Sequence, residues 1–358
     1  MKERTLSIQP PFGGTLLLTM LILISLLACG EMLTRTRLFK SYFIAASRGS
    51  PHFQFELQLG RLESIIAQEG PIDCIFLGNS MVWLGFDPLV FSQAFQEKTG
   101  KELSCYNFGV DGLPVSGASA IKQYLIQKYQ PKLLIYGTDA RDFAVPREDR
   151  DATVILDIPW MQYHLGKFTL QGWLYENSHI YRYLETFGYL LRMEKQYLFI
   201  KNPGQYTSED FGFRVDSRIS DIVSTSPVQH LDLGPVRYYY QLLSDYKMLP
   251  ENMSSLEEIL NINHELTSLL VVVMPVPETY MDFFSTKPQN YQLFIEQVRD
   301  TSEKYGSSFW LPPDNIIPQD GWADYTHLNT RGAAAFSAWL GGQVGEAVNE
   351  GSVFALSR

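Results

Sequence analysis

The sequence has few cysteines and few positive charges, and both features narrow the range of functions. Its three cysteines, Cys29, Cys74 and Cys105, form no C-x-x-C pair and no cluster with histidine, so we expect no zinc site. Cys74 and Cys105 begin apolar runs, where a cysteine is usually a small buried hydrophobic residue. Lysine and arginine total 29 against 39 acidic residues, a net charge of −10. This charge disfavours nucleic acid as a partner, because phosphate backbones bind to basic surfaces.

Nucleotide-binding motifs are also missing. Neither G-x-G-x-x-G nor G-x-x-x-x-G-K-[ST] follows an apolar run, so we do not expect a nucleotide binder of the flavodoxin type. The chain has no internal repeat and no low-complexity tract, and nothing in it implies a metal or an organic cofactor. Apolar residues make up 45% of its 358 positions. This composition suits one large domain or two small ones with a packed core.

One long hydrophobic run lies near the N-terminus. After a tail over residues 1–12, residues 13–33 have no polar face, and the first charge among them is Glu31. The run is long enough to span a membrane, and we expect an uncleaved signal-anchor. A cleaved signal peptide and a lipoprotein signal with Cys29 as the lipidated residue are the alternatives. Basic residues flank both ends, so the charges do not fix the orientation.

The remainder of the chain alternates between strand and helix patterns. Residues 34–70 predict a linker and a helix that ends before Pro71. Five short apolar runs then follow: Cys74–Leu77, Cys105–Phe108, Leu133–Tyr136, Leu269–Met274 and Ser308–Leu311. Near-continuous apolar strands separated by helical patterns indicate a parallel sheet that is covered on both faces. In such sheets the functional residues gather at the carboxyl ends of the strands.

A long segment between the third and fourth apolar runs interrupts this alternation. Residues 141–264 are rich in aromatic side chains, among them Trp160, Trp173 and Tyr175. We interpret the segment as an inserted helical cap or subdomain, and we expect most of its rings to form its own core. The alternative is an aromatic wall that binds a sugar or an acyl chain.

The residues after the strands include a candidate catalytic triad. Ser80 follows the first run in Gly-Asn-Ser, and Asp324 and His327 follow the last run, just before a helical pattern. A serine hydroxyl is a weak nucleophile, so it needs a base to take its proton and an acid to orient that base. The three residues supply these roles in the order Ser…Asp…His. The sequence therefore predicts nucleophilic acyl transfer at this edge of the sheet.

Acyl transfer also needs donors for a negatively charged intermediate. The backbone N–H groups of Ser80 and Gly109 are candidates, because glycine allows a close approach of the backbone to a ligand. The side chain of Asn107, on the same strand as Gly109, is a further candidate.

Four motifs together give the chain a family resemblance. "FLGNSM", "YNFGVDG", "YGTDARDF" and "DYTHLN" are similar to the first, second, third and fifth sequence blocks of the SGNH (GDSL-like) hydrolase superfamily. The resemblance covers about half of the chain. It implies a three-layer α/β/α sandwich around a parallel five-stranded sheet, the flavodoxin-like SGNH fold, formed by residues 71–140 and 265–358. It also implies Ser80 as nucleophile, His327 as base and Asp324 as the orienting acid.

Two positions depart from the pattern of this superfamily. Asn79 replaces the acid of the usual Gly-Asp-Ser, and Asp139 stands where the third block usually has an oxyanion-binding asparagine. An ionised carboxylate at this position would repel the developing negative charge. We therefore expect either that Asp139 points away, paired with Arg141, or that another donor such as Asn107 substitutes for it.

The anchor and the motifs together suggest a function in the cell envelope. The chain resembles envelope acyl-transfer proteins that have one N-terminal membrane helix and an extracytoplasmic SGNH-like domain, some of which work beside a multispanning membrane acyltransferase. The resemblance implies a single-pass membrane protein, an esterase or O-acyltransferase whose substrate is an acylated envelope glycan or lipid. The alternative is a catalytically weak or inactive accessory protein that binds an envelope polymer or a membrane acyltransferase.

Overall fold

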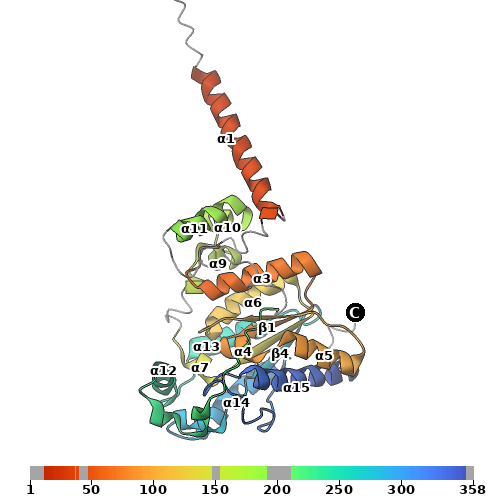
Figure 1. Ribbon diagram of the computed structural model, residues 1–358, viewed down its shortest axis with the longest axis vertical. Helices are drawn as coiled ribbons and strands as arrows, with labels where there is room; N and C mark the ends of the chain where they lie inside the picture. The colour runs from red at the N-terminus through yellow and green to blue at the C-terminus, as the bar shows by residue number, and fades with distance from the viewer. Residues whose placement is uncertain (1–11, 37, 40–46, 147–153, 192–210, 352–358) are drawn as a thin grey trace, which may run out of the picture.

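A five-stranded, all-parallel β-sheet forms the centre of the computed structural model, which describes residues 12–36, 38–39, 47–146, 154–191 and 211–351 (Figure 1). The strands lie in the order β2-β1-β3-β4-β5. They are β1 (Cys74–Gly78), β2 (Cys105–Gly109), β3 (Leu133–Thr138), β4 (Ser268–Val273) and β5 (Ser308–Trp310). The five apolar runs of the sequence are confirmed as these strands, and their ends agree to within two residues. Cys74 and Cys105 are buried, as expected.

Helices pack against both faces of the sheet, because alternate side chains of each strand point to opposite sides. Ile75 and Leu77 join a core on one face, and Cys74 and Phe76 join a core on the other. The first face is covered by α3 (Phe53–Glu69), α6 (Val115–Tyr129), α13 (Pro250–Leu260) and α14 (Gln289–Lys304). The second is covered by α4 (Ser80–Gly85), α5 (Pro88–Thr99) and α15 (Thr330–Asn349).

Local sequence signals set the ends of the helices on the second face. Asp87 caps α5 by accepting hydrogen bonds from the N–H groups of Leu89 and Val90, and proline occupies the first helical position. Gly100 ends α5 in the left-handed conformation. Asn329 caps α15 in the same way, with its Oδ1 2.9 Å from the N of Arg331. The helix therefore begins three residues after His327.

The N-terminal helix α1 (Phe12–Arg35) projects from the folded body as a separate rod (Figure 1). Its residues Gly13–Arg35 are long and apolar enough to span a membrane, and none of its most apolar stretch is buried. Three helices lie between α1 and α3 in Figure 1: α9 (Pro159–His164), α10 (Leu170–Asn177) and α11 (His179–Leu191).

The aromatic-rich segment 141–264 is helical over much of its described part. It contains α9 to α11, α13, the end of α7 (Ala140–Ala144), α12 (Gly234–Leu243) and the 3₁₀ turns η4 (Asp221–Ser224) and η5 (Pro227–His230). A third 3₁₀ turn, η6 (Glu278–Phe283), follows β4. Trp160 and Tyr175 are buried in the core that contains Phe55 of α3. These rings therefore share the core of the sheet and do not form a separate one.

Three glycines lie side by side at the carboxyl ends of three neighbouring strands. Gly78 of β1 pairs with Gly109 of β2 and with Gly137 of β3. A Cβ atom on Gly109 would lie 2.3 Å from the backbone N of Trp83, and one on Gly137 would lie 2.5 Å from Cγ2 of Val82. The glycines therefore let α4, which begins at Ser80, lie directly against the ends of the strands.

We expect Gly109→Ala to destabilise the fold by about 1–3 kcal/mol, because the added methyl group meets backbone that cannot move aside without shifting α4. Urea unfolding followed by tryptophan fluorescence measures the change. The matched control is Gly342→Ala in α15, where the nearest atom to an added Cβ is 3.8 Å away. Alanine is the better helix former, so this variant keeps or raises the wild-type stability. Equal stability of the two variants would contradict the glycine argument.

Candidate active site

Ser80 is the first residue of α4, at the carboxyl end of β1. The preceding Asn79 caps the helix, with its Oδ1 2.7 Å from the N of Met81. Ser80 is 9% exposed. The cap and the close packing of α4 on the three strand ends fix the position of the serine with little freedom.

His327 and Asp324 lie in a tight turn between β5 and α15. An isolated antiparallel bridge joins Trp322 to Leu328 across the turn, and the N–H of Ala323 donates to the carbonyl of His327 at 2.9 Å. These two links close the turn on itself. The capped start of α15 then holds its far side, so both side chains have a defined position.

The structure brings the three predicted triad residues into one hydrogen-bonded row. Nε2 of His327 lies 2.8 Å from Oγ of Ser80. Nδ1 of the same ring lies 2.9 Å from Oδ2 and 3.0 Å from Oδ1 of Asp324. With Nδ1–H donated to the carboxylate, Nε2 is the acceptor for the serine proton. The arrangement is able to activate a serine hydroxyl.

The surroundings of Asp324 favour its ionised form. Burial raises its pKa, but hydrogen bonds from the His327 ring and from the N–H groups of Thr326 and His327 outweigh burial and lower the pKa to about 2. The carboxylate is therefore charged at neutral pH. It is positioned to hold the imidazole in one orientation and to stabilise a positive charge on it.

Two further carboxyl groups, those of Asp139 and Asp142, lie next to the residue that precedes Ser80. Nδ2 of Asn79 donates to Oδ1 of Asp142 at 2.9 Å and to Oδ1 of Asp139 at 3.2 Å. Asp139 also caps α7 and accepts a hydrogen bond from the hydroxyl of Tyr280. Both carboxyl groups are almost completely buried. Asn79 thus connects the turn that carries Ser80 with the turn after β3.

The pKa of Asp139 is raised more strongly than the pKa of Asp142. Burial and the negative charge of Asp142 raise the pKa of Asp139 well above its usual range. Burial also raises the pKa of Asp142, but its partners Arg141 and Asn79 act in the opposite direction. In its protonated form Asp139 carries no charge. It would then not repel an oxyanion, in contrast to the ionised carboxylate considered from the sequence.

Arg141 forms an ion pair with Asp142. The pairing with Asp139 that the sequence suggested is not formed. NH1 of Arg141 lies 3.4 Å from Oδ1 of Asp142 and donates to the carbonyl of Gly112 at 3.1 Å. Its guanidinium lies over the ring of Tyr238. Arg141 therefore ties the turn after β2 to the turn after β3.

The donors of Gly109 and Asn107 already have acceptors within the protein. The N–H of Gly109 donates to Oδ1 of Asn107 at 2.8 Å. Nδ2 of Asn107 donates to the carbonyls of Val82 and Phe86, at 2.8 and 2.7 Å. These bonds fix α4 on β2. They disfavour Gly109 and Asn107 as donors to an oxyanion in this conformation.

The turn after β2 offers another backbone donor. The N–H groups of Val110, Asp111 and Leu113 donate to Gly78 O, Gln54 Oε1 and Val110 O, respectively. In the described part of the chain, the N–H of Gly112 has no such acceptor. The carbonyl of Gly112 is held by Arg141, and its φ is +70°. A backbone of this conformation suits glycine.

No sequence pattern indicates the strap, residues 211–220, that joins α4 to the turn of His327. The N–H of Arg214 donates to the carbonyl of Trp83, and its guanidinium lies 4.7 Å from the centre of that ring. Further on, the carbonyl of Asp216 accepts from the N and Oγ1 of Thr330. Arg214 lies far from Ser80 in sequence, so no spacing could indicate it. Trp83 lies one helical turn after Ser80, and a tryptophan at this position was the sequence feature that could have indicated such a contact.

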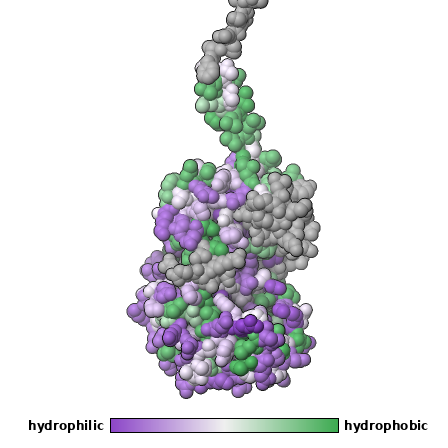
Figure 2. Space-filling model, turned by 90° about the vertical axis from the view of Figure 1, so that its left-hand side faces the viewer, coloured by the Kyte–Doolittle hydropathy of each residue, from purple (hydrophilic) through white to green (hydrophobic). Residues whose placement is uncertain are grey.

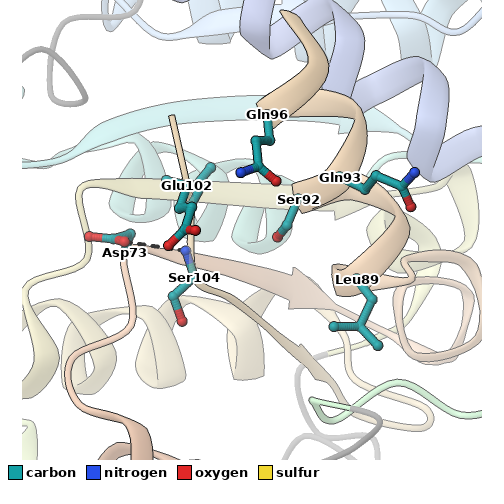
Figure 3. A pocket seen from close by; sticks show the side chains of 8 residues that line it. Asp73, Leu89, Ser92, Gln93, Gln96, Glu102 and Ser104 are labelled. Carbon is teal, nitrogen blue, oxygen red and sulfur yellow. Dashed lines mark hydrogen bonds between the residues drawn. The ribbon is translucent and has the colours of Figure 1, made fainter. Parts of the chain in front are cut away.

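A pocket of about 400 Å³ lies near the amino ends of β1 and β2, at the end of the sheet opposite Ser80 (Figure 3). Its walls come from α5 and from the segments that precede β1 and β2, including Asp73, Gln96 and Glu102. It is therefore separated from Ser80 by the length of the strands. No group of three or more His, Cys, Asp or Glu side chains among the described residues is arranged to hold a metal ion.

Comparisons with known proteins do not place the chain in a family. No protein-family model matches it, and neither does any curated protein. The geometry of the site is therefore the basis for a function.

We expect the free energy of unfolding of Asp139→Asn, relative to the wild type, to increase as pH rises. A carboxyl group with a raised pKa contributes stability below its unfolded pKa and loses that contribution as pH rises toward its folded pKa. Asparagine cannot ionise, and it keeps an oxygen for Asn79. Urea unfolding at pH 4.5 and pH 8 measures the difference between variant and wild type. We expect the difference to change in favour of the variant between pH 4.5 and pH 8, because only the wild type loses stability as Asp139 is deprotonated. A difference that does not vary with pH would contradict the assignment.

Proposed function

We propose that this chain is a membrane-anchored serine esterase or O-acyltransferase that acts on an acyl ester of a cell-envelope glycan or lipid. The observation that carries the proposal is the continuous row of hydrogen bonds from Ser80 through His327 to Asp324. Three residues that are separated by up to 247 positions meet with the geometry that nucleophilic acyl transfer requires.

In the proposed reaction, the Ser80 hydroxyl attacks the carbonyl carbon of the ester while Nε2 of His327 takes its proton. The alcohol then leaves with that proton, and the acyl group stays on the serine. Water or a sugar hydroxyl accepts the acyl group in the second half, with His327 again as base. Asp324 stays ionised and stabilises the imidazolium that forms in each half.

Two backbone groups are the proposed oxyanion donors. The N–H of Ser80 is at the start of a helix, where no intrahelical acceptor is in reach. The N–H of Gly112 is the second, in place of Gly109 and Asn107, whose donors serve the fold. Contacts from Gly112 through Arg141 and Asp142 to Asn79 support its place beside the nucleophile.

The fold supports the same proposal. A parallel sheet with helices on both faces is what a three-layer α/β/α sandwich of the SGNH type requires, and Ser80, Asp324 and His327 lie where that fold carries its catalytic residues. We therefore propose membership of the SGNH (GDSL-like) superfamily.

The proposed location is a single-pass membrane protein with its catalytic domain outside the cytoplasm. The helix α1 supports an uncleaved anchor, because Glu31 and Arg35, which follow Cys29, contact residues of the folded body. An envelope substrate and a multispanning acyltransferase partner fit this location.

A second candidate function is that of an accessory protein with little or no catalytic activity. The observation that favours it is the acidic Asp139 at the third-block position, buried with Asp142 behind the nucleophile. Such a protein would bind an envelope polymer or a membrane acyltransferase. Turnover of a short acyl ester that is lost in His327→Ala would exclude it.

We expect a fluorophosphonate probe to label the wild-type protein and not Ser80→Ala, because the probe reacts with a serine that a base has activated. His327→Ala should lower the labelling rate by at least about a hundredfold, since general-base assistance contributes 10²–10⁴-fold. Ser92→Ala, in the pocket near the amino ends of β1 and β2, is the matched control and should label normally. Labelling that persists in Ser80→Ala would show that the proposal is wrong.

Asn79 and Asp139 should be exchangeable as a pair. Asn79→Asp alone places three carboxyl groups together and displaces the start of α4, so we expect labelling of Ser80 to slow by about tenfold to a hundredfold. The double variant Asn79→Asp/Asp139→Asn again has two carboxyl groups and one amide. It should recover much of the wild-type labelling rate. A double variant as slow as Asn79→Asp would show that the contact is not a positioning contact.

A further inference from the structure

Two of the helices next to α1, α10 and α11, expose large hydrophobic side chains, and so does the segment just before α10. Leu170 of α10 is 66% exposed and Trp173 is 42% exposed, and Phe168, just before this helix, is 71% exposed. On α11, Leu184 is 65% exposed. Hydrophobic residues, shown in green, lie on the end of the body from which α1 projects (Figure 2). The helices that carry these residues lie next to α1 (Figure 1).

The exposed residues of α10 form a stripe that faces away from the protein core. Leu170, Trp173 and Asn177 follow each other at intervals of three and four residues, which places them on one side of a helix. Gly172 and Tyr175, on the opposite side, are buried. The stripe therefore belongs to the outer surface of the layer that α9, α10 and α11 form.

This stripe is continuous with the end of α1. The carbonyl of Asn177 accepts a hydrogen bond from NH2 of Arg35 at 2.9 Å. Glu31 accepts hydrogen bonds from the backbone N atoms of His179 and Ile180, at 2.8 and 3.1 Å, so it caps the start of α11. The end of α10 and the start of α11 thus meet α1 where the apolar part of α1 ends.

The layer is also fixed firmly to the body. Trp160 of α9 is completely buried, and the guanidinium of Arg48 lies 5.4 Å from the centre of its ring. Arg48 is itself buried, and its NH2 lies 2.6 Å from a carboxylate oxygen of Glu63 on α3. The exposed stripe therefore has one orientation relative to both the body and α1.

We propose that the exposed surface formed by Phe168, Leu170, Trp173 and Leu184 lies in the headgroup–acyl boundary of the bilayer that α1 crosses. This inference depends on the membrane anchor of the proposed function and not on the catalytic row. Exposed aromatic and aliphatic side chains with a lysine, here Lys167, exposed beside them are typical of segments that lie in a membrane interface. The contacts with Glu31 and Arg35 bring the surface to the level at which the span leaves the bilayer.

Quenching by brominated lipids tests this placement on the full chain. All six tryptophans lie outside α1, and Trp173 is the most exposed of them. The protein is reconstituted in phosphatidylcholine–phosphatidylglycerol vesicles, with or without lipids brominated near the carbonyl end of one acyl chain. We expect brominated lipid to lower the wild-type emission, and we expect this loss to disappear in Trp173→Phe. Trp339→Phe, on α15, is the matched control and should keep the loss.

A second variant tests the stripe without removing the reporter. Leu170→Glu places a charge next to Trp173, so it should reduce the quenching. Leu89→Glu, an exposed position on α5, should leave it unchanged. Flotation with the vesicles shows whether α1 inserts, and fluorophosphonate labelling reports on Ser80 separately. Protein that floats but shows no quenching, or the same quenching in Trp173→Phe, would overturn the inference and leave a protein partner as the occupant of this surface.

Discussion

The side-chain amide of Asn79 connects the parts of the site that come from different strands. Its oxygen caps the helix that begins with Ser80, and its nitrogen donates to both Asp139 and Asp142. Without an amide here, each of the two buried carboxyl groups would lose the hydrogen bond that it accepts from the residue before Ser80. The start of α4 at Ser80 and the two buried carboxyl groups are therefore connected through this one group. The row of three glycines has a complementary role, because it allows α4 to approach the strands closely enough for the amide to reach both carboxyl groups.

The sequence could predict the sheet and the proximity of Ser80, His327 and Asp324 because both follow from short-range patterns. Strands buried on both faces appear as apolar runs, and parallel strands bring their carboxyl ends to one edge, so Ser80 and His327 had to lie near each other. The roles of Gly109 and Asn107 could not be predicted. A glycine after a strand serves equally well for approaching a ligand or for packing against a helix, and only the 2.3 Å gap between a Cβ on Gly109 and Trp83 N distinguishes the two uses.

Neither the protonation of Asp139 nor the strap of residues 211–220 could be predicted from the sequence, and the reasons differ. The protonation of a carboxyl group depends on burial and on neighbouring charges, and Asp142 becomes such a neighbour only because both residues face inward. The strap comes from a segment with no periodic pattern and makes mostly backbone contacts, which residue type does not encode. The same limit applies to the aromatic segment 141–264. Its composition indicated a helical insertion but not that Trp160 and Tyr175 would join the core of the sheet.

The contact of Glu31 with the start of α11 restricts how the folded body is held relative to α1. A domain on a flexible tether samples a wide volume above the membrane, and its effective concentration toward any one target falls as the tether lengthens. Here the last turn of α1 is bonded to the folded body, so height and tilt are set by the protein itself. If α1 spans a bilayer, as we propose, Ser80 stays within a thin layer parallel to that bilayer as the protein diffuses. Targets within this layer would be found by a two-dimensional search, and targets at other heights would not be reached.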